Sequence, residues 1–181
     1  MSTDNNTVTE WEEVSREQVF KKYSRVIDKV DFVLGDGSVG DFYLRNESGA
    51  VCVVALTPDN EVVMARQFRP GPNKILLELP GGGIDAGETP EQAIAREFLE
   101  ETGYEGTFEF VGTCLDDAYS TMERFCFVAR DCKKVAEPQN SPAETIEVVL
   151  LPLDEFRTHL RSGQLTDVEV GYRCLDHLSL L

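Results

Sequence analysis

The chain has 181 residues, of which 41% are hydrophobic and 28% are charged, and its formal net charge is −16. This length and composition fit one soluble globular domain with a proper hydrophobic core. The negative charge argues against a nucleic-acid polymer as partner, because such binding depends on lysine and arginine displacing phosphate counterions. The first ten residues are polar and no apolar run reaches membrane-spanning length, so we expect neither a secretory signal nor a membrane partner.

The five cysteines are odd in number, scattered along the chain, and include no Cys-x-x-Cys pair. Most of them lie inside apolar, strand-like runs. We therefore expect buried free thiols in a cytoplasmic protein, and neither a disulfide framework nor a zinc site.

The first 46 residues are expected to form a disordered tail, over residues 1–10, and then an N-terminal extension, over residues 11–46. The extension begins with a short helix at Trp11–Lys22. Two strand-like runs then flank Asp36-Gly37, a favourable hairpin turn, at Arg25–Leu34 and Gly40–Leu44.

The rest of the chain, residues 47–181, is expected to form one domain. Ala50–Thr57 is a continuous apolar run, typical of a strand that is buried on both faces. A turn at residues 58–60 follows, and Glu61–Phe68 is expected to pair back as a second core strand. Further strands are expected at Ile75–Leu79, Thr107–Cys114, Arg124–Arg130 and Thr145–Leu151, loops at Leu115–Glu123 and Asp131–Ala143, and helices at Leu153–Arg161 and Val168–Leu180. This order predicts an α+β fold, a mixed sheet with helices on its faces.

A helix with clear boundaries is predicted between these strands, at Pro90–Thr102. Thr89 is a good N-cap, Pro90 suits the first helical position, and Gln92 completes a Thr-x-x-Gln capping box. Gly103 is a typical helix stop.

Three glutamates of this helix, Glu97, Glu100 and Glu101, fall within about one third of its circumference. Ala95, Phe98 and Leu99 are expected to face the core, with Ile94 at the flank. Each like-charge pair costs about a few tenths of a kcal/mol on an isolated helix. Either water solvates such an acidic face or a cation binds to it, and the residue types alone leave both readings open.

The stretch from Gly82 to Tyr104 matches the Nudix box, the signature of the Nudix hydrolases. The matching positions are Gly82, Glu88, Arg96, Glu97, Phe98, Glu100, Glu101, Gly103 and Tyr104. Phe98 and Tyr104 replace the aliphatic residues that are more usual at these two positions. The resemblance specifies the fold as a Nudix-type α/β/α sandwich over residues 47–181, with the N-terminal strands added to it.

The resemblance also implies a reaction and a cofactor. Nudix enzymes hydrolyse a nucleoside diphosphate that is linked to another group, and they require Mg²⁺ or Mn²⁺, here two or three ions per site. Carboxylates suit this role because hard divalent cations prefer oxygen ligands. The implied metal ligands are Glu97, Glu101, the carbonyl of Gly81, and Glu100 as a further ligand or water-mediated contact.

Other box residues are expected to support these ligands. The resemblance implies that Arg96 contributes to catalysis by orienting the glutamates through hydrogen bonds. Its i, i+4 relation to Glu100 permits such a bond on a helix. Glu88 braces the loop to the helix or contacts metal. The general base is expected outside the box helix, and the resemblance leaves Glu144 and Glu123 as candidates, with Glu144 favoured. Either residue is otherwise a solvated loop charge.

A second block points to the substrate. Residues 66–71 read RQFRPG and residues 77–80 read LELP, which together resemble the ADP-ribose/ADP-sugar pyrophosphatase branch of the family. Arg66 and Arg69 lie on opposite sides of a strand. Whichever side faces the site therefore presents a guanidinium to a phosphate. Glu78 is a polar substrate contact or a strand-edge charge. Tyr119 stacks on a base or caps the core; its loop lacks the Ser-Pro-Gly that is common in this branch.

Members of this branch are commonly homodimers, and the apolar residues of the extension favour a dimer here. The expected partner is a small nucleoside diphosphate-linked substrate, ADP-ribose or a related nucleotide sugar. Two alternatives remain at this point: a sensor that binds nucleotide sugars without hydrolysis, and a Nudix hydrolase of dinucleotides or nucleoside triphosphates.

Overall fold

The structure of the protein, a computed structural model, describes residues 7–142 and 145–181. By its internal contacts the chain divides into two compact units, Met1–Ser48 with Asp116–Met122, and Gly49–Leu115 with Glu123–Leu181. The predicted tail over residues 1–10 falls mostly outside the described residues, and residues 7–11 contain no helix or strand. No helix in the described parts of the chain is both long and apolar enough to cross a membrane.

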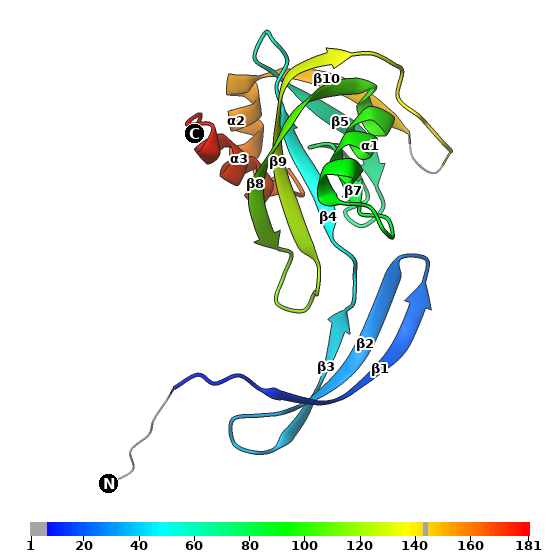
Figure 1. Cartoon of the computed structure of the whole chain (residues 1–181), viewed down its shortest axis with the longest axis vertical. Coiled ribbons are helices and arrows are strands. Elements are labelled where there is room, and N and C mark those ends of the chain that lie inside the picture. Colours follow the sequence, from blue (N-terminus) through cyan, green and yellow to red (C-terminus); the bar gives the residue numbers. More distant parts are fainter. Residues whose placement is uncertain (1–6, 143–144) are drawn as a thin grey trace. The chain divides into compact units, whose positions relative to one another are not determined.

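The N-terminal unit contains one antiparallel sheet with strand order β1-β2-β3 (Figure 1). Its strands are β1 (Glu12–Lys22), β2 (Arg25–Val33) and β3 (Val39–Arg45). The hairpin predicted around Asp36-Gly37 is confirmed, because β2 pairs with β3 and the Gly37 N–H donates to the Leu34 carbonyl at 2.9 Å. Gly37 has φ +83°, a conformation that favours glycine.

The helix predicted at Trp11–Lys22 is wrong, because this segment is strand β1 and pairs with β2 along its length. Two register shifts, at Glu13/Ser15 and Gln18/Phe20, interrupt the strand. Bulges of this kind break the two-residue alternation by which a strand is recognised in a sequence. Trp11 packs on Phe32 and Phe42, with ring centroids 6.2 and 5.3 Å away, so tertiary contacts override the local helix preference.

The second unit contains two sheets and three helices. One sheet has strand order β10-β5-β6 and the other β7-β4-β9-β8. All pairs are antiparallel except β4–β9, which is parallel, so the predicted mixed topology is confirmed. The elements are β4 (Ala50–Ala55), β5 (Glu61–Arg69), β6 (Lys74–Glu78), β7 (Gly81–Gly83), α1 (Pro90–Thr102), β8 (Tyr104–Leu115), β9 (Glu123–Lys134), β10 (Ile146–Pro152), α2 (Leu153–Arg161) and α3 (Val168–His177).

Two predictions about the strands of this unit need correction. β5 does not pair back on β4 beyond the single bridge Leu56–Val62; it lies in the other sheet, between β10 and β6. The strands that flank β4 and β5 include β9 and β10, which come much later in the chain, and local sequence cannot reveal this. β9 also continues to Lys134, where it pairs with Tyr104 of β8, so the loop predicted from Asp131 starts later.

Helices cover both faces of the strands, as Figure 1 shows with α1 on one side and α2 and α3 on the other. Cys52 and Val54 of β4 belong to the core cluster that includes the buried side chains of α2 and α3. Val51 and Val53 belong to the cluster that includes α1. The apolar run of β4 is therefore buried on both faces, as predicted, and the fold is the predicted α/β/α sandwich.

Candidate active site

Helix α1 has the boundaries that the sequence predicts. Thr89 and Gln92 form the complete capping box, in which the Thr89 side chain accepts from the Gln92 N–H and the Gln92 side chain accepts from the Thr89 N–H. Gly103 ends the helix in the left-handed conformation, at φ +71°. A Cβ at Gly103 would lie 2.1 Å from the Ala136 carbonyl oxygen, so only glycine fits this close approach. The capping box and Gly103 therefore fix where α1 begins and ends.

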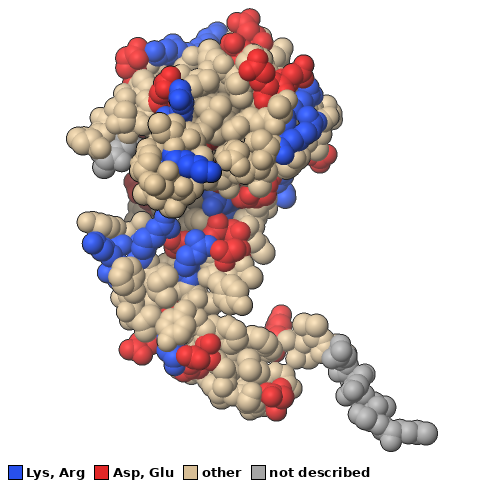
Figure 2. All heavy atoms as spheres, turned by 180° about the vertical axis from the view of Figure 1, so that it is seen from behind, with Lys and Arg blue, Asp and Glu red and all other residues tan. Residues whose placement is uncertain are grey.

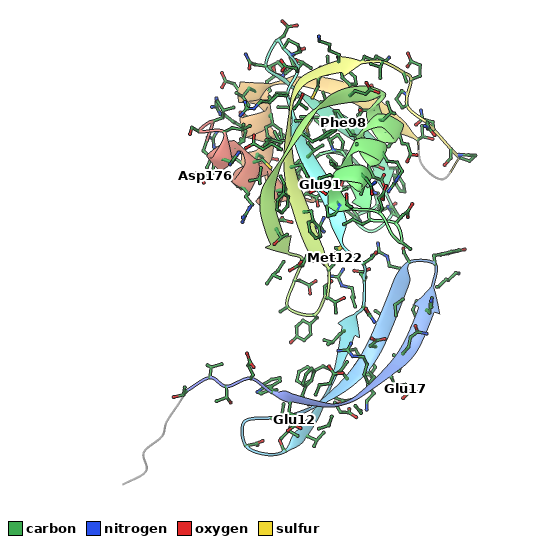
Figure 3. The ribbon with its side chains drawn as sticks, in the orientation of Figure 1. Glu12, Glu17, Glu91, Phe98, Met122 and Asp176 are labelled. Carbon is green, nitrogen blue, oxygen red and sulfur yellow. The ribbon has the colours of Figure 1, made fainter. Side chains whose placement is uncertain are left out.

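The buried side of α1 differs from the predicted one. Ile94 and Phe98 are fully buried, whereas Ala95 is exposed and Leu99 is only half-buried. Phe98, labelled in Figure 3, packs on Tyr104 and Phe108 of β8, with ring centroids 6.4 and 5.7 Å away. Glu101 also lies on the buried side, with 6% of its surface exposed. The core stripe is thus rotated toward the glutamates, so at least one of these carboxylates is not part of a solvated face.

Strand β7 brings backbone against two of the carboxylates. The Gly81 N–H donates to Oε2 of Glu101 at 2.9 Å. A Cβ at Gly82 would lie 2.4–2.6 Å from the carboxylate atoms of Glu97, and one at Gly81 would lie 2.1 Å from the Val51 carbonyl oxygen. Gly81 is therefore required by its close approach to the backbone of β4, whereas a Cβ at Gly82 would displace the mobile carboxylate of Glu97.

Arg96 connects the box loop to the helix carboxylates. Its guanidinium donates two hydrogen bonds to Glu88, at 2.9 and 2.8 Å, and one to the Gly83 carbonyl at 3.1 Å. It also donates to Glu97 at 2.8 Å and to Glu100 at 3.3 Å. These bonds from Arg96 hold the pKa of Glu88 below its usual value. The positive charge of Arg96 offsets the mutual repulsion of the three carboxylates that it contacts, Glu88, Glu97 and Glu100.

The side chains of this region fit a hard divalent cation by their chemistry. Glu97 and Glu101, one helical turn apart, both place their carboxylates against the β7 backbone. Within residues 7–142 and 145–181, no three Asp, Glu, His or Cys side chains form a complete ligand set by themselves. Mg²⁺ commonly keeps several waters and takes only one or two protein carboxylates, so two glutamates and a backbone carbonyl suffice.

The two candidate arginines of β5 lie in different surroundings. Arg66 is exposed and pairs with Glu147 of β10 at 3.3 Å, on the outside of the sheet. Nε of Arg69 contacts Oε2 of Glu78 at 2.5 Å, and the Glu78 side chain is only 1% exposed. Glu78 is therefore a buried partner of Arg69 and not a strand-edge charge.

Tyr119 lies in the loop between β8 and β9 that belongs to the N-terminal unit. Its side chain is 56% exposed, so it does not cap a core. The loop is anchored at its backbone, because the Arg45 N–H donates to the Tyr119 carbonyl at 2.8 Å. The Arg45 guanidinium also pairs with Asp116 and Asp117 of the same loop.

The two candidate bases are Glu144 and Glu123. Glu144 lies outside the described residues. Glu123 is exposed and is the first residue of β9. Ala50 of β4 pairs with Arg124 on one side and with Gly83 on the other, so Glu123 and Gly83 lie at the same end of the sheet. Their strands are two positions apart, which corresponds to roughly 10 Å.

Sequence reasoning missed a group of polar residues beside Glu78. The Thr166 hydroxyl donates to Oε1 of Glu78 at 2.6 Å, and the adjacent Asp167 pairs with Arg124. Burial raises the pKa of Asp167. Thr166 and Glu78 are 88 residues apart and belong to no common motif, so no local signal links them.

Comparison with known proteins agrees with this geometry. The NUDIX domain matches residues 47–172 of the chain. An ADP-ribose pyrophosphatase of Bacillus subtilis is 26% identical over 164 residues, which cover 88% of each chain. A protein of Bacillus methanolicus named methanol dehydrogenase activator is 34% identical over 157 residues, which cover 85% of each chain.

A crystal structure described as an ADP compounds hydrolase superposes with a TM-score of 0.77, covering 97% of this chain and 99% of that one, at 19% identity. At this identity the likeness concerns the fold. The family match covers more than half of the chain and includes the glycines of β7, the hydrogen-bonded Arg96 and the three glutamates of α1. The chain therefore belongs to the Nudix hydrolase family.

Proposed function

We propose that this Nudix hydrolase cleaves the pyrophosphate bond of ADP-ribose or a related nucleotide sugar, with Mg²⁺ or Mn²⁺ as cofactor. A water oxygen bonds to one phosphorus, the bridging P–O bond breaks, and the products are a nucleoside monophosphate and a sugar phosphate. The observation that carries the proposal is the packing of two α1 carboxylates, Glu97 and Glu101, against the backbone of Gly81 and Gly82.

The metal-holding residues in this proposal are Glu97, Glu101, the Gly81 carbonyl and, directly or through water, Glu100. When bound, two or three divalent ions supply positive charge that neutralises the pyrophosphate and favours attack by water. Arg96 keeps these carboxylates in place, because it bonds to Glu97 and Glu100 while Glu88 holds its other edge.

Attack by water also requires a base to accept its proton. We retain Glu144 and Glu123 as the candidates. The position of Glu123 at the same sheet end as Gly83 supports it as a candidate. A pH–rate profile tests each one: the glutamine variant of the base loses the acidic limb, and the variant of the other residue keeps it.

The proposed substrate class rests on Arg69 and on the relatives. Arg69 is held at its Nε edge by a buried carboxylate, while its side chain is 40% exposed, so it is able to bind a phosphate. Arg66 pairs with Glu147 on an exposed surface, which is weaker support for a role in binding. Tyr119 is exposed and remains available to stack on a base. The relative of Bacillus subtilis is named ADP-ribose pyrophosphatase, which favours that substrate.

A homodimer is part of the same proposal. The N-terminal unit exposes large apolar side chains along its strands, among them Val14 at 50%, Phe20 at 51%, Val39 at 63% and Tyr43 at 58%. Light scattering at micromolar concentration tests this, and a monomer contradicts it.

We also propose a cytoplasmic location, where free thiols remain reduced. A nucleic-acid polymer remains an unfavourable partner at a net charge of −16, and Figure 2 shows acidic and basic side chains next to one another at several places on one face.

A hydrolysis screen tests the proposed function. ADP-ribose, GDP-mannose, NADH, diadenosine polyphosphates and nucleoside triphosphates are each incubated with Mg²⁺, and with EDTA as control. We expect the highest kcat/KM on ADP-ribose or another nucleotide sugar, and no turnover in EDTA. Preference for a dinucleotide or a triphosphate would replace the substrate assignment, and tight binding without turnover would indicate a sensor.

A further inference from the structure

A chain of hydrogen bonds and ion pairs lies beside β5 and β6, outside the Nudix box. It runs from Arg69 through Glu78 and Thr166 to Asp167 and Arg124. The members come from three separate parts of the sequence: β5 and β6, the segment between α2 and α3, and the start of β9. This hydrogen-bond network therefore connects Arg69, the proposed phosphate-binding residue, to the segment between α2 and α3.

Glu78 is the centre of this hydrogen-bond network, and both of its carboxylate oxygens have a partner. Oε2 contacts Nε of Arg69 at 2.5 Å, and Oε1 accepts from the Thr166 hydroxyl at 2.6 Å. The side chain is 1% exposed, so water cannot readily replace a lost partner. Because each oxygen has its own donor, the rotation of the carboxylate plane is fixed from both sides.

The orientation of Glu78 decides which edge of Arg69 is presented outward. A guanidinium has five N–H donors in one plane, and Glu78 uses the Nε edge. Arg69 donates to no other residue within the described parts of the chain, and its side chain is 40% exposed. The Nη edge is therefore available for the bidentate geometry that suits a phosphate.

The side chains of Thr166 and Asp167 bond within this network and do not cap the helix that follows them. Asp167 stands at the N-cap of α3, where aspartate usually bonds to a backbone N–H, yet α3 has no side-chain cap. Its carboxylate instead contacts Arg124 and the Thr166 hydroxyl, the latter at 3.1 Å. Thr166 is itself exposed, so its hydroxyl is not needed to fill the core.

We propose that Thr166 is a positioning residue for substrate binding: its hydroxyl fixes Glu78, which holds Arg69 with the Nη edge directed at a substrate phosphate. The proposal rests on the proposed function, because it takes the substrate to be a nucleoside diphosphate-linked compound. It assigns to the segment between α2 and α3 a part in binding, although this segment contains no residue of the Nudix box.

The test is a kinetic comparison of Thr166→Val and Thr166→Ser with ADP-ribose at saturating Mg²⁺. Valine keeps the shape and removes the hydroxyl, so we expect KM to rise about threefold to tenfold, the range of one hydrogen bond, with kcat within about twofold. Serine keeps the hydroxyl and should restore the wild-type KM. Thr158→Val is the matched control, because Thr158 is an exposed threonine of α2 whose hydroxyl donates to the Asp154 carbonyl of the same helix.

A double-mutant cycle separates positioning from a general structural role. In an Arg69→Lys background, lysine still balances the Glu78 charge but has no planar fork to align. Thr166→Val should then change KM by less than about twofold. An unchanged KM in the single Thr166→Val variant, or an equal rise in both backgrounds, overturns the proposal. Failure of the wild-type enzyme to hydrolyse any compound of the screen overturns the proposed function instead, and with it this inference.

Discussion

The Glu101 carboxylate accepts a hydrogen bond from the Gly81 N–H at 2.9 Å, which ties the buried side of α1 to the backbone of β7. Glu101 is 6% exposed, and burial of a carboxylate is costly unless it is hydrogen-bonded or paired. A solvated acidic face does not account for this placement. The arrangement is what a metal site needs from its protein: acidic oxygens held next to backbone at fixed positions.

Replacement of Glu101 by glutamine should separate catalysis from folding. The amide oxygen still accepts from Gly81, and the buried charge is removed, so the Tm in EDTA should hold or rise. Turnover should fall by roughly two orders of magnitude or more, the scale of losing a group that stabilises transition-state charge. Steady-state kinetics and thermal unfolding in EDTA measure the two effects.

The control for this variant is Glu91→Gln, at an exposed position in the first turn of α1 (Figure 3). It changes the charge of the same helix by the same amount and should leave turnover within about twofold, as expected of an exposed surface site. Near wild-type turnover in Glu101→Gln would remove Glu101 from the metal ligands.

Gly82→Ala should displace a carboxylate without disturbing the fold. The new Cβ would lie 2.4–2.6 Å from the carboxylate atoms of Glu97, which is the mobile end of a side chain and is able to move away. The Tm should change little, whereas kcat/KM should fall roughly tenfold or more, because a shift of about 1 Å in a catalytic group is costly. Gly83→Ala is the matched control, since a Cβ there meets nothing within 4 Å. Equal activity of the two variants would contradict the assigned position of Glu97.

Glu88→Gln should reveal a pH-dependent part of the stability. Hydrogen bonds from Arg96 lower the pKa of Glu88 in the folded state. A lowered pKa contributes stability that is present above the unfolded-state value, near 4.5, and is lost as the pH falls through the folded-state value. We therefore expect Glu88→Gln to lower the Tm at pH 7, and the difference from wild type to narrow below about pH 4.5.

Thermal unfolding between pH 3.5 and 7 measures that difference. Asp85→Asn is the control. Asp85 lies in the same loop, but its side chain is 82% exposed and lies 3.9 Å from the Arg96 guanidinium, too far for a hydrogen bond. A constant difference between wild type and Glu88→Gln across this pH range would show that the Glu88–Arg96 pair does not act through its charge.

The parts of the site that the sequence predicts are those encoded by neighbouring residues. Thr89, Gln92 and Gly103 define α1 locally, so the helix boundaries are correct to the residue. The rotation of α1 is set by packing against distant strands, and for this reason Ala95 and Leu99 were wrongly expected in the core. The bond between Thr166 and Glu78 joins residues 88 positions apart, and only the fold brings them together.

The N-terminal extension shows the same limit in a different form. Its hairpin is marked by Asp36-Gly37 and is predicted correctly, because a turn of this type has a local signature. β1 has no such mark, and its two bulges remove the alternation of a strand. β1 pairs with β2 across the two-residue turn Tyr23-Ser24, which lacks the glycine that marks the other hairpin, and this pairing determines its structure.

The thiols provide a prediction about the core that does not depend on activity. All five cysteines are free, and Cys52, Cys126, Cys132 and Cys174 are buried, whereas Cys114 is partly exposed. Burial raises the pKa of Cys132 and of Cys174 to about 12, and that of Cys52 well above its ordinary value. At pH 8 these thiols therefore stay protonated, whereas the thiolate is the form that reacts, and burial keeps a reagent away from them.

We expect iodoacetamide at pH 8 to alkylate at most one cysteine of the native protein, Cys114, and all five after unfolding in guanidinium chloride. Intact-mass spectrometry counts the added groups, and peptide mapping identifies the site. Cys114→Ser is the control and should leave the native protein unlabelled. Rapid labelling of Cys132 or Cys174 before unfolding would show that the strands around them open readily, and that the buried thiols are not part of a closed core.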